Sequence, residues 1–546
     1  MNGSNTQDAG DVEITRRHLF KTVPVIGVAA TVPTAGAVTP AKRTVNVRDF
    51  GAKGDGITDD TAAFKTALAA AQIVDVPLGT YCIEAALKLS DGHLVRGAGR
   101  SGWDPYTGTG PPRSASRTEI VIDARVGFDA RDTNNAAVSG LAIRARKTTQ
   151  SRWGAPPGVQ VGSIGIDIAG SLQFDARDMS FHGLDVAVSS VADHGTTTQM
   201  PHIGNWVAHD CATVFRFVST NKKFNAVRDA RIEGCLAALH CNRIVEARNC
   251  DGLRIENARF FQCTLNSILI EDTPFVAIIG VTLFETGEET VILRACRYVT
   301  MSGIMLARAG FYRGGPLVQH AAMLWDKCID MSFEGVIEQP VGRAITILDC
   351  TNISVNATIG TPYWSTGNLA SADGAIRIER SNSISLTASF SGSSYWIAVW
   401  ADAASAPNVS GRIVTEGSAG VVRCVHLQSA PWGQVVRKSS ASRVAPTTSV
   451  LLEELRVLVP PGKSLVSRCV EWTVSAIVPE VTGSYWQAME KAEPGGGAIS
   501  IERKVLYRNA NTVAHYASIP ISIHNPSGQP VTLPAGLEVR LSLAFE

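Results

Sequence analysis

Short segments recur along the chain at nearly regular intervals, and each consists of one apolar residue, one small or polar residue and a second apolar residue. The segments begin at Leu253, Val276, Val299, Ile329, Ile353 and Ile384, at intervals of 23, 23, 30, 24 and 31 residues. Period-two alternation is typical of β-strands, and self-similarity at this spacing is typical of a solenoid. The Leu/Asn signature of leucine-rich repeats is missing, and the β-branched residues disfavour a helical repeat. The pattern therefore predicts an all-β chain whose main part is a β-helix with three-sided coils.

The chain ahead of these repeats predicts a strand, a turn and a helix. Residues 45–50 alternate as in a strand, and the next six residues, GAKGDG, supply a turn. Thr58 fits a helix N-cap, with Asp59 and Asp60 in the first turn, where the helix dipole favours negative charge. An open solenoid end exposes unpaired strand edges and core. We therefore expect this helix to cap the N-terminal end of the β-helix.

The pattern changes after residue 437. A polar stretch reads as a linker, and alternating segments follow at residues 470–478, 499–507 and 537–545, separated by Pro- and Gly-rich turns. These features predict an antiparallel β-sandwich, with a role in carbohydrate binding or in trimer formation. The expected domains are a signal segment, a β-helix, a linker and a sandwich, at residues 1–37, 38–437, 438–447 and 448–546.

Composition narrows the classes of function. The 546 residues include 50 Lys+Arg and 49 Asp+Glu, so the net charge is +1, and this balance argues against binding nucleic acid or an anionic membrane surface. Hydrophobic residues make up 45% and charged residues 18%, which argues against disorder. No apolar run reaches the length of about 18 residues that a membrane-spanning helix needs.

The 11 cysteines form no CxxC pair and no zinc-type spacing with histidine. Cys241 and Cys263, like Cys328 and Cys350, lie about one repeat apart. We interpret them as small buried side chains stacked in a repetitive core. Disulfides are the alternative, and an exported protein could hold them.

The N-terminus contains TRRHLFK at residues 15–21, then an apolar stretch and the small residues Ala35-Gly36-Ala37. This arrangement resembles a twin-arginine export signal, apart from the exchanged order of Leu19 and Phe20. An amphipathic helix is the alternative, although prolines and a glycine interrupt it. The resemblance implies a bacterial protein that is exported to the periplasm or the outside of the cell.

The string VNVRDFGAKGDGITDDTAAFKTAL, which begins at Val45, resembles the entry segment of the pectate-lyase-like superfamily of right-handed parallel β-helices. The resemblance covers residues 45–100 and implies the fold more than the chemistry, because lyases, hydrolases and phage tailspikes share this segment. Polygalacturonase motifs are incomplete: a leading Gly is missing before His182-Gly183, and Arg377-Ile378-Glu379 stands in place of RIK. The catalytic residues of those families are therefore not transferred to this chain.

Polar residues follow the strands of successive coils and form the candidate site. Equivalent positions of stacked coils lie about 4.8 Å apart, so these residues are expected to form one ladder. The ladder consists of His182, His209, Glu233, Gln262 and Glu285, with Asp210 beside it. A row of ordinary solvated turn residues is the alternative interpretation.

The ladder suits polysaccharide chemistry. Hydrolysis needs two carboxyl groups, and β-elimination on a uronic acid needs a base and a cation that neutralises the substrate carboxylate. We expect Glu233 or Glu285 to act as general acid or base, with His209, Asp210 and His182 as further catalytic residues. The expected substrate-binding residues are arginines for uronate carboxylates, an amide, and aromatics that stack on sugars. They are Arg231, Arg254, Arg308, Gln262, Trp153 and Trp325.

The sequence therefore predicts an exported protein that cleaves an acidic or complex polysaccharide as a lyase or a glycoside hydrolase. A non-catalytic polysaccharide-binding or adhesion protein, and a phage-derived tailspike-like depolymerase, are the alternatives. We expect no cofactor and no protein-held metal, except Ca²⁺ if the reaction is that of a lyase. The expected partner is the polysaccharide, and the expected assembly is a homotrimer.

Overall fold

The computed structural model describes residues 44–100, 117–148, 158–192, 195–221, 223–310, 320–360, 374–390 and 399–416 except 403, 406 and 407, together with separate strands between residues 425 and 543. The predicted signal segment lies outside the described residues, and so does Trp153. Among the described residues, no helix is long and apolar enough to cross a membrane.

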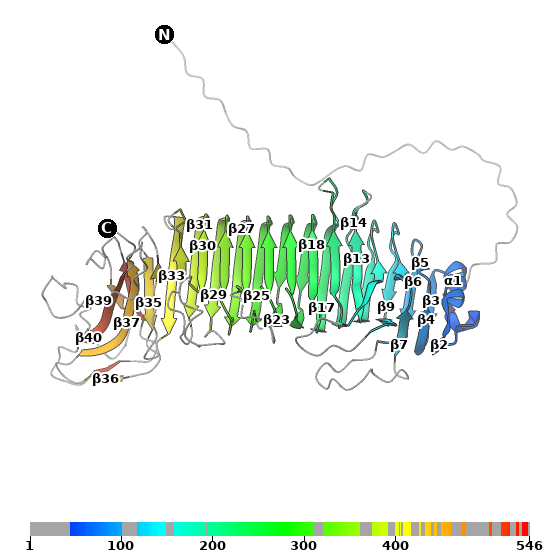
Figure 1. The fold of residues 1–546 in the computed structure, drawn as a ribbon, viewed down its shortest axis with the longest axis horizontal. Coiled ribbons are helices and arrows are strands. Elements are labelled where there is room, and N and C mark those ends of the chain that lie inside the picture. Colours follow the sequence, from blue (N-terminus) through cyan, green and yellow to red (C-terminus); the bar gives the residue numbers. More distant parts are fainter. Residues whose placement is uncertain are drawn as a thin grey trace, which may run out of the picture. The chain divides into compact units, whose positions relative to one another are not determined.

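Each coil consists of three extended segments, which pair in parallel with their counterparts in the next coil (Figure 1). Two consecutive segments, here called the first leg and the second leg, belong to one large sheet. The third segment belongs to a second sheet. The chain passes through the first leg, the second leg and the second sheet in turn, so the prediction of a parallel β-helix of three-sided coils agrees with the observed sheets.

Some strands of the large sheet form only one leg. In the first leg these are β1 Thr44–Asn46, β3 Ile73–Val76, β6 Leu94–Gly97, β9 Ala137–Ser139, β14 Thr198–Gln199, β19 Asp251–Glu256 and β22 Pro274–Ile279. In the second leg they are β2 Asp55–Asp59, β4 Gly79–Ile83, β7 Thr118–Ile122, β10 Ala142–Ala145, β20 Arg259–Cys263 and β23 Thr282–Thr286.

Other strands are long enough to continue through both legs. They are β12 Asp175–His182, β15 His202–His209, β17 Val227–Leu239, β25 Arg297–Ala307, β27 Ile329–Glu338, β29 Thr351–Ile359, β31 Asn382–Phe390 and β33 Val409–Glu416. In several coils a single residue at the corner between the legs has a positive φ, between 50° and 64°. These corner residues are Asp178, Asn205, Gly234, Asn257, Gly280 and Gly303. Gly, Asn and Asp tolerate this left-handed conformation best, which explains the choice of residues.

The second sheet contains thirteen strands. They are β5 Leu87–Lys88, β8 Val126–Asp129, β11 Gln160–Asp167, β13 Leu184–Val191, β16 Thr213–Val218, β18 Arg243–Arg248, β21 Ile268–Glu271, β24 Val291–Arg294, β26 Met323–Asp326, β28 Ile345–Leu348, β30 Ile376–Glu379, β32 Val399–Ala401 and β34 Val425–His426.

The register of the first leg matches the sequence repeat in all but one coil. Leu253 pairs with Val276, and Val276 with Val299, as the intervals predict. In the next coil Val299 pairs with Met331, whereas the repeat predicts Ile329. The prediction is wrong by two residues, and a shift of two keeps every side chain on its expected face.

The core is filled by inward-facing apolar residues of all three segments, and its largest members are wholly buried. Trp206 lies edge-on to Phe215, with ring centroids 4.7 Å apart. The nine cysteines within the described residues are buried and free, which agrees with the interpretation as stacked core residues for that part of the chain.

The N-terminal helix, α1 Thr61–Ala70, buries Phe64 and Leu68 and contacts β1, β3 and β5 (Figure 1). A short 3-10 helix, η1 Val47–Phe50, precedes it. The predicted N-cap is wrong: Thr58 belongs to β2, because its backbone N–H and hydroxyl both donate to Asp55. Asp60 occupies the cap position. That α1 serves as a cap of the solenoid stays a prediction.

Strand pairing changes to antiparallel after residue 437. β42 Glu538–Leu543 pairs with β35 Trp432–Arg437 and with β38 Trp472–Val474. β37 Ser449–Val459 pairs with β40 His515–His524, which also pairs with β39 Glu502–Lys504. β36 Ser442–Val444, which falls within the predicted linker, pairs with β41 Val531–Leu533. The β-sandwich and the domain boundaries stay predictions.

Candidate functional site

One column of turn residues runs along the end of the second leg. Its members, Gly183, Asp210, His240, Gln262, Glu285, Arg308 and Gln339, come from successive coils, and each has a φ between 46° and 66°. Strand pairing fixes the column: His182, His209 and Leu239 are paired, and so are Phe261, Phe284 and Ala307, each directly ahead of a column member. We call this set the turn column, and the strand-end residues ahead of it the adjacent row.

The predicted single ladder is therefore wrong in its register. His182 and His209 lie in the adjacent row, whereas Asp210, Gln262 and Glu285 lie in the turn column. Glu233 lies in neither, because it belongs to the first leg and pairs with Gly204 and Glu256. The main cause is that β17 runs through both legs, so Glu233 lies at the end of the first leg while the partner of His209 is Leu239 at the end of the second. A register shift between Cys235 and Ala237 adds one further residue.

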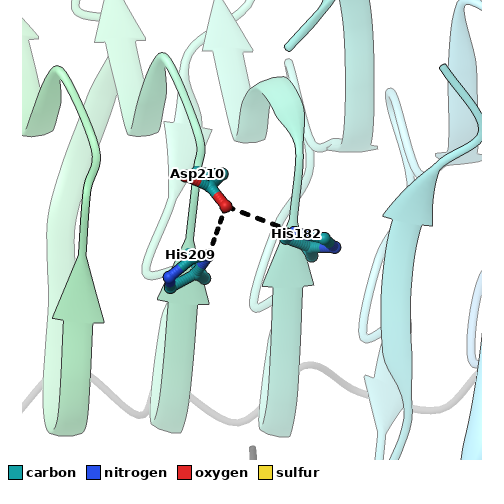
Figure 2. A group of neighbouring side chains, drawn as sticks. All are labelled: His182, His209 and Asp210. Atoms are coloured by element: carbon teal, nitrogen blue, oxygen red, sulfur yellow. Dashed lines mark ion pairs between the residues drawn. The ribbon is translucent and has the colours of Figure 1, made fainter. Parts of the chain in front are cut away.

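His182, His209 and Asp210 form a compact cluster at one end of the column (Figure 2). The side chain of Asp210 is wholly buried, with Oδ2 lying 2.5 Å from Nδ1 of His209 and 3.4 Å from Nε2 of His182. His209 is nearly buried, whereas 32% of the His182 side chain is exposed. Burial lowers the pKa of His209, and the neighbouring carboxylate of Asp210 opposes that shift. Two imidazole nitrogens and one carboxylate oxygen lie within 4.8 Å of one another, a donor set that suits a divalent transition metal.

His240 extends this cluster and was missed in the sequence. It follows Asp210 in the turn column, and its ring centroid lies 5.0 Å from that of His209. A signal for the register was present: a buried cysteine follows the column in three consecutive coils, as Asp210-Cys211, His240-Cys241 and Gln262-Cys263. Aligning these cysteines places His240 beside Asp210.

Glu285 and Arg308 form an ion pair farther along the same column. Arg308 Nη1 lies 2.8 Å from Glu285 Oε1, and Gln262 Nε2 donates to Glu285 Oε2 at 3.1 Å. The guanidinium of Arg308 also lies 5.2 Å from the ring centroid of Phe284. Phe284 packs on Phe261 of the preceding coil, with 6.2 Å between ring centroids, and both rings are only partly buried. Three of the predicted site residues, Gln262, Glu285 and Arg308, are thus brought together.

Three other predicted site residues, Arg231, Glu233 and Arg254, lie together on the first leg. Arg231 binds two carboxylates on adjacent coils, Glu233 at 2.6 Å and Glu256 at 3.0 Å. Glu233 Oε1 also lies 2.7 Å from Nε2 of His202. The hydrogen bond from Arg254 holds the pKa of Glu256 below its ordinary value. The signal for this network is the repeated tripeptide Arg-Ile-Glu, at residues 231–233 and 254–256, which pairs in register.

Trp325 is not a substrate-binding residue. The side chain lies in β26 and is wholly buried, with its ring 6.0 Å from that of Phe333 in the core. The prediction that it stacks on a sugar is wrong, because Met323 and Trp325 both point inward in a strand of alternating burial. A tryptophan in this position cannot stack on a sugar.

The comparisons with known proteins agree with the fold. Residues 44–107 match the family described as rhamnogalacturonase A/epimerase, pectate lyase-like. The pre-neck appendage protein of Bacillus phage phi29 is 43% identical over 193 residues, which cover 31% of this chain and 20% of that protein. The mannuronan C5-epimerase AlgE5 of Azotobacter vinelandii is 32% identical over 188 residues, which cover 30% of this chain and 17% of the epimerase.

Two solved structures are also similar. The A-module of the Azotobacter vinelandii mannuronan C-5 epimerase AlgE6 has a TM-score of 0.41 and 15% identity, over 69% of this chain and 98% of that one. The N-terminal fragment of bacteriophage phi29 gene product 12 has a TM-score of 0.46 and 16% identity, over 70% of this chain and 68% of that one. The matched segments span a fifth or less of the length of the two curated relatives named above. The resemblance to pectate-lyase-like β-helix proteins is confirmed by the family match, and the twin-arginine signal stays a prediction.

Proposed function

We propose, from the pectate-lyase-like fold, that this chain is a carbohydrate-active protein that binds an acidic polysaccharide along the end of the second leg and abstracts a proton from it. The observation that carries the proposal is the ion pair of Glu285 and Arg308, placed beside two outward aromatic rings. We call the surface formed by Phe261, Phe284, Gln262, Glu285 and Arg308 the binding strip.

The binding strip combines the groups that an acidic sugar requires. An arginine fork matches a carboxylate in two hydrogen bonds, and about a third of the Arg308 side chain is open to solvent. Aromatic rings offer apolar faces to the C–H groups of sugars, and Phe261 and Phe284 lie side by side on adjacent coils. Because the strip follows the axis along which the coils stack, an extended polymer can contact several coils at once.

The arrangement of carboxyl groups favours elimination over hydrolysis. A glycosidase needs a protonated and an ionised carboxyl group about 5–9.5 Å apart. Asp210 and Glu285 are three coils apart, which is about 14 Å at the usual strand spacing. Glu233 and Glu256 are close enough, but Arg231 binds both, and the lowered pKa of Glu256 keeps it ionised and unsuited to act as an acid.

In the proposed reaction a uronate carboxylate takes the place of Glu285 on Arg308, which neutralises the sugar and releases Glu285 as a base. Glu285 accepts the C5 proton. The electron pair of the C5–H bond forms a C4=C5 double bond, the C4–O bond breaks, and the leaving oxygen takes a proton from water. The hydroxide that remains takes the proton from Glu285, which restores water and the base. Return of a proton to the opposite face of C5 would instead give an epimer, the outcome that the name of the C5-epimerase relative suggests.

A non-catalytic or tailspike-like carbohydrate-binding protein is the second candidate, favoured by the similarity to the pre-neck appendage protein. We further propose export through the twin-arginine signal, a cap formed by α1, and a homotrimer held by a C-terminal β-sandwich. The antiparallel pairing of β37, β40 and β39 supports the β-sandwich in this proposal.

The test uses the full chain with polymannuronate, polygalacturonate and a neutral glucan as substrates. Unsaturated products are read by ultraviolet absorbance, epimers by NMR, and chain breaks by new reducing ends. We expect product from an acidic polymer, and a loss of rate of about 100-fold or more in Glu285→Gln with binding retained, because a positioned base contributes that much.

The matched control is the ion pair of Glu271 and Arg294 on the second sheet, one coil apart at 2.9 Å. Glu271→Gln should leave the rate unchanged. Equal losses in both variants, or an unchanged rate in Glu285→Gln, would contradict the assignment of Glu285. Binding without any product would contradict the reaction and favour the second candidate.

A further inference from the structure

We propose that His182, His209 and Asp210 form a binding site for a divalent transition-metal ion such as Zn²⁺, with ligands from two adjacent coils. The ligand atoms are Nε2 of His182, Nδ1 of His209 and a carboxylate oxygen of Asp210. The site is separate from the ion pair of the binding strip, because Asp210 and Glu285 lie three coils apart, or about 14 Å.

The distances among the donor atoms suit such an ion. In a tetrahedral zinc site with ligand bonds of about 2.0–2.1 Å, neighbouring donor atoms lie about 3.3 Å apart. Nε2 of His182 and Oδ2 of Asp210 are 3.4 Å apart, close to that value. Nδ1 of His209 lies closer, at 2.5 Å from the same oxygen, so a small rotation of the carboxylate or of the imidazole would complete the geometry.

The burial of the cluster gives it the form of a built site. Asp210 is wholly buried and only 7% of the His209 side chain is exposed, while the 32% exposed part of His182 leaves the cluster open to solvent at that residue. Three protein ligands with one open position are the pattern of zinc sites that bind a water molecule or a substrate oxygen. The two nitrogen donors argue against Ca²⁺, which prefers six to eight oxygen ligands.

His240 supplies an independent observation. Its ring packs edge-on against that of His209, and its buried Nδ1 has no hydrogen-bond partner among the residues that the structure describes. The chain has 11 histidines, and three of them, His182, His209 and His240, follow one another in ring contact on successive coils, with Asp210 paired to the first two. An imidazole beside a metal ligand can orient that ligand or take up a further coordination position, and a buried nitrogen without a partner is otherwise unfavourable.

The backbone gives this site a clean test. Asp210 has a φ of 52°, a conformation that Asn also tolerates, so Asp210→Asn should fold and lose only the charge. His182→Gln alters a side chain that is partly exposed and should also be tolerated. The matched control is His202→Gln, because His202 is also partly exposed and contacts carboxylates, Asp175 at 2.9 Å and Glu233 at 2.7 Å.

The experiment titrates the chelator-treated full chain with ZnCl₂ in a calorimeter, without polysaccharide, and repeats the titration with CaCl₂. Thermal unfolding with and without zinc confirms that each variant is folded. Loss of a residue that only hydrogen-bonds to a metal ligand weakens metal binding by about 10–100-fold, and loss of a ligand itself should cost at least as much. We therefore expect one zinc ion per chain, with affinity lowered at least tenfold in His182→Gln and in Asp210→Asn, and unchanged in His202→Gln.

Three results would overturn the proposal: no zinc binding to the wild-type chain, wild-type zinc affinity in the His182 and Asp210 variants, or loss of binding in His202→Gln. CoCl₂ provides a second readout, because tetrahedral Co²⁺ with nitrogen ligands absorbs visible light and the spectrum should vanish in Asp210→Asn. Because these titrations contain no polysaccharide, their failure is distinct from a failure of the proposed function, and Glu285→Gln should bind zinc as the wild type does.

Discussion

Glu285 and Arg308 lie on adjacent coils at the point where the second leg ends, with 2.8 Å between the carboxylate and the guanidinium. Arg308 also lies over the ring of Phe284. An arginine held in this way presents a fixed fork to an incoming carboxylate, whereas lysine offers a single flexible ammonium group.

Arg308→Lys should therefore weaken the binding of an acidic polysaccharide by about tenfold, because one of two paired hydrogen bonds and the ring contact are lost. The effect should appear mainly in KM, with a smaller change in kcat. Steady-state kinetics on an acidic polymer provide the measurement, and Arg294→Lys on the second sheet is the control. A change in kcat alone would contradict a role for Arg308 in binding.

Trp325→Ala should destabilise the chain by about 3–5 kcal/mol, because the wholly buried side chain leaves a cavity. Urea denaturation followed by circular dichroism measures the loss. Phe275→Ala, at a residue that is 58% exposed, should cost much less. Trp325→Phe should leave polysaccharide affinity unchanged, and a specific loss of affinity in that variant would show that the buried position is misassigned.

The thiols of Cys250 and Cys263 should resist alkylation in the folded protein. Burial raises the pKa of each to about 12, so the reactive thiolate is scarce at pH 8. Treatment with iodoacetamide followed by peptide mass spectrometry should find these two residues unmodified in the native protein and modified in denaturant. Rapid labelling under native conditions would indicate that the core opens at these coils.

The pair of His320 and Glu289 should make stability depend on pH. The hydrogen bond to Glu289 raises the pKa of His320, and the negative charge of Glu288 adds to the effect. Burial is the largest single influence on Glu289 and acts to raise its pKa. The hydrogen bond with His320, a backbone hydrogen bond and the positive charges of His320 and Arg294 together outweigh burial and lower the pKa below 4.5.

A raised histidine pKa stabilises the fold below the unfolded value of 6.5, and that stability is lost as pH rises through the folded pKa. A lowered glutamate pKa stabilises above 4.5, and that stability is lost as pH falls through the folded pKa. The difference in Tm between wild type and His320→Gln should therefore be largest between about pH 5 and pH 6.5 and shrink on both sides. A difference that grows above pH 8 would contradict this account.

Some of the site was visible in the sequence and some was not. The residue types were found, because His182, His209, Asp210, Gln262, Glu285 and Arg308 all lie at the end of the second leg. Glu233 was misplaced because β17 continues through both legs, so a strand segment that ends at Glu233 in the sequence pattern is only the first leg of a longer strand. Trp325 was misplaced because a buried strand with a large aromatic reads like a loop aromatic when its neighbours are unknown.

The sequence by itself determined the repeat, the parallel coils and the inward face of the repeated first-leg segments, since these follow from period-two alternation that each segment carries locally. Even the error at Ile329 preserved the faces, because the shift was an even number. Which polar residues meet was decided only by the tertiary structure. His182 meets Asp210, and Glu285 meets Arg308, because strand pairing sets which coil positions stack, and one inserted residue moves every later side chain to a new neighbour.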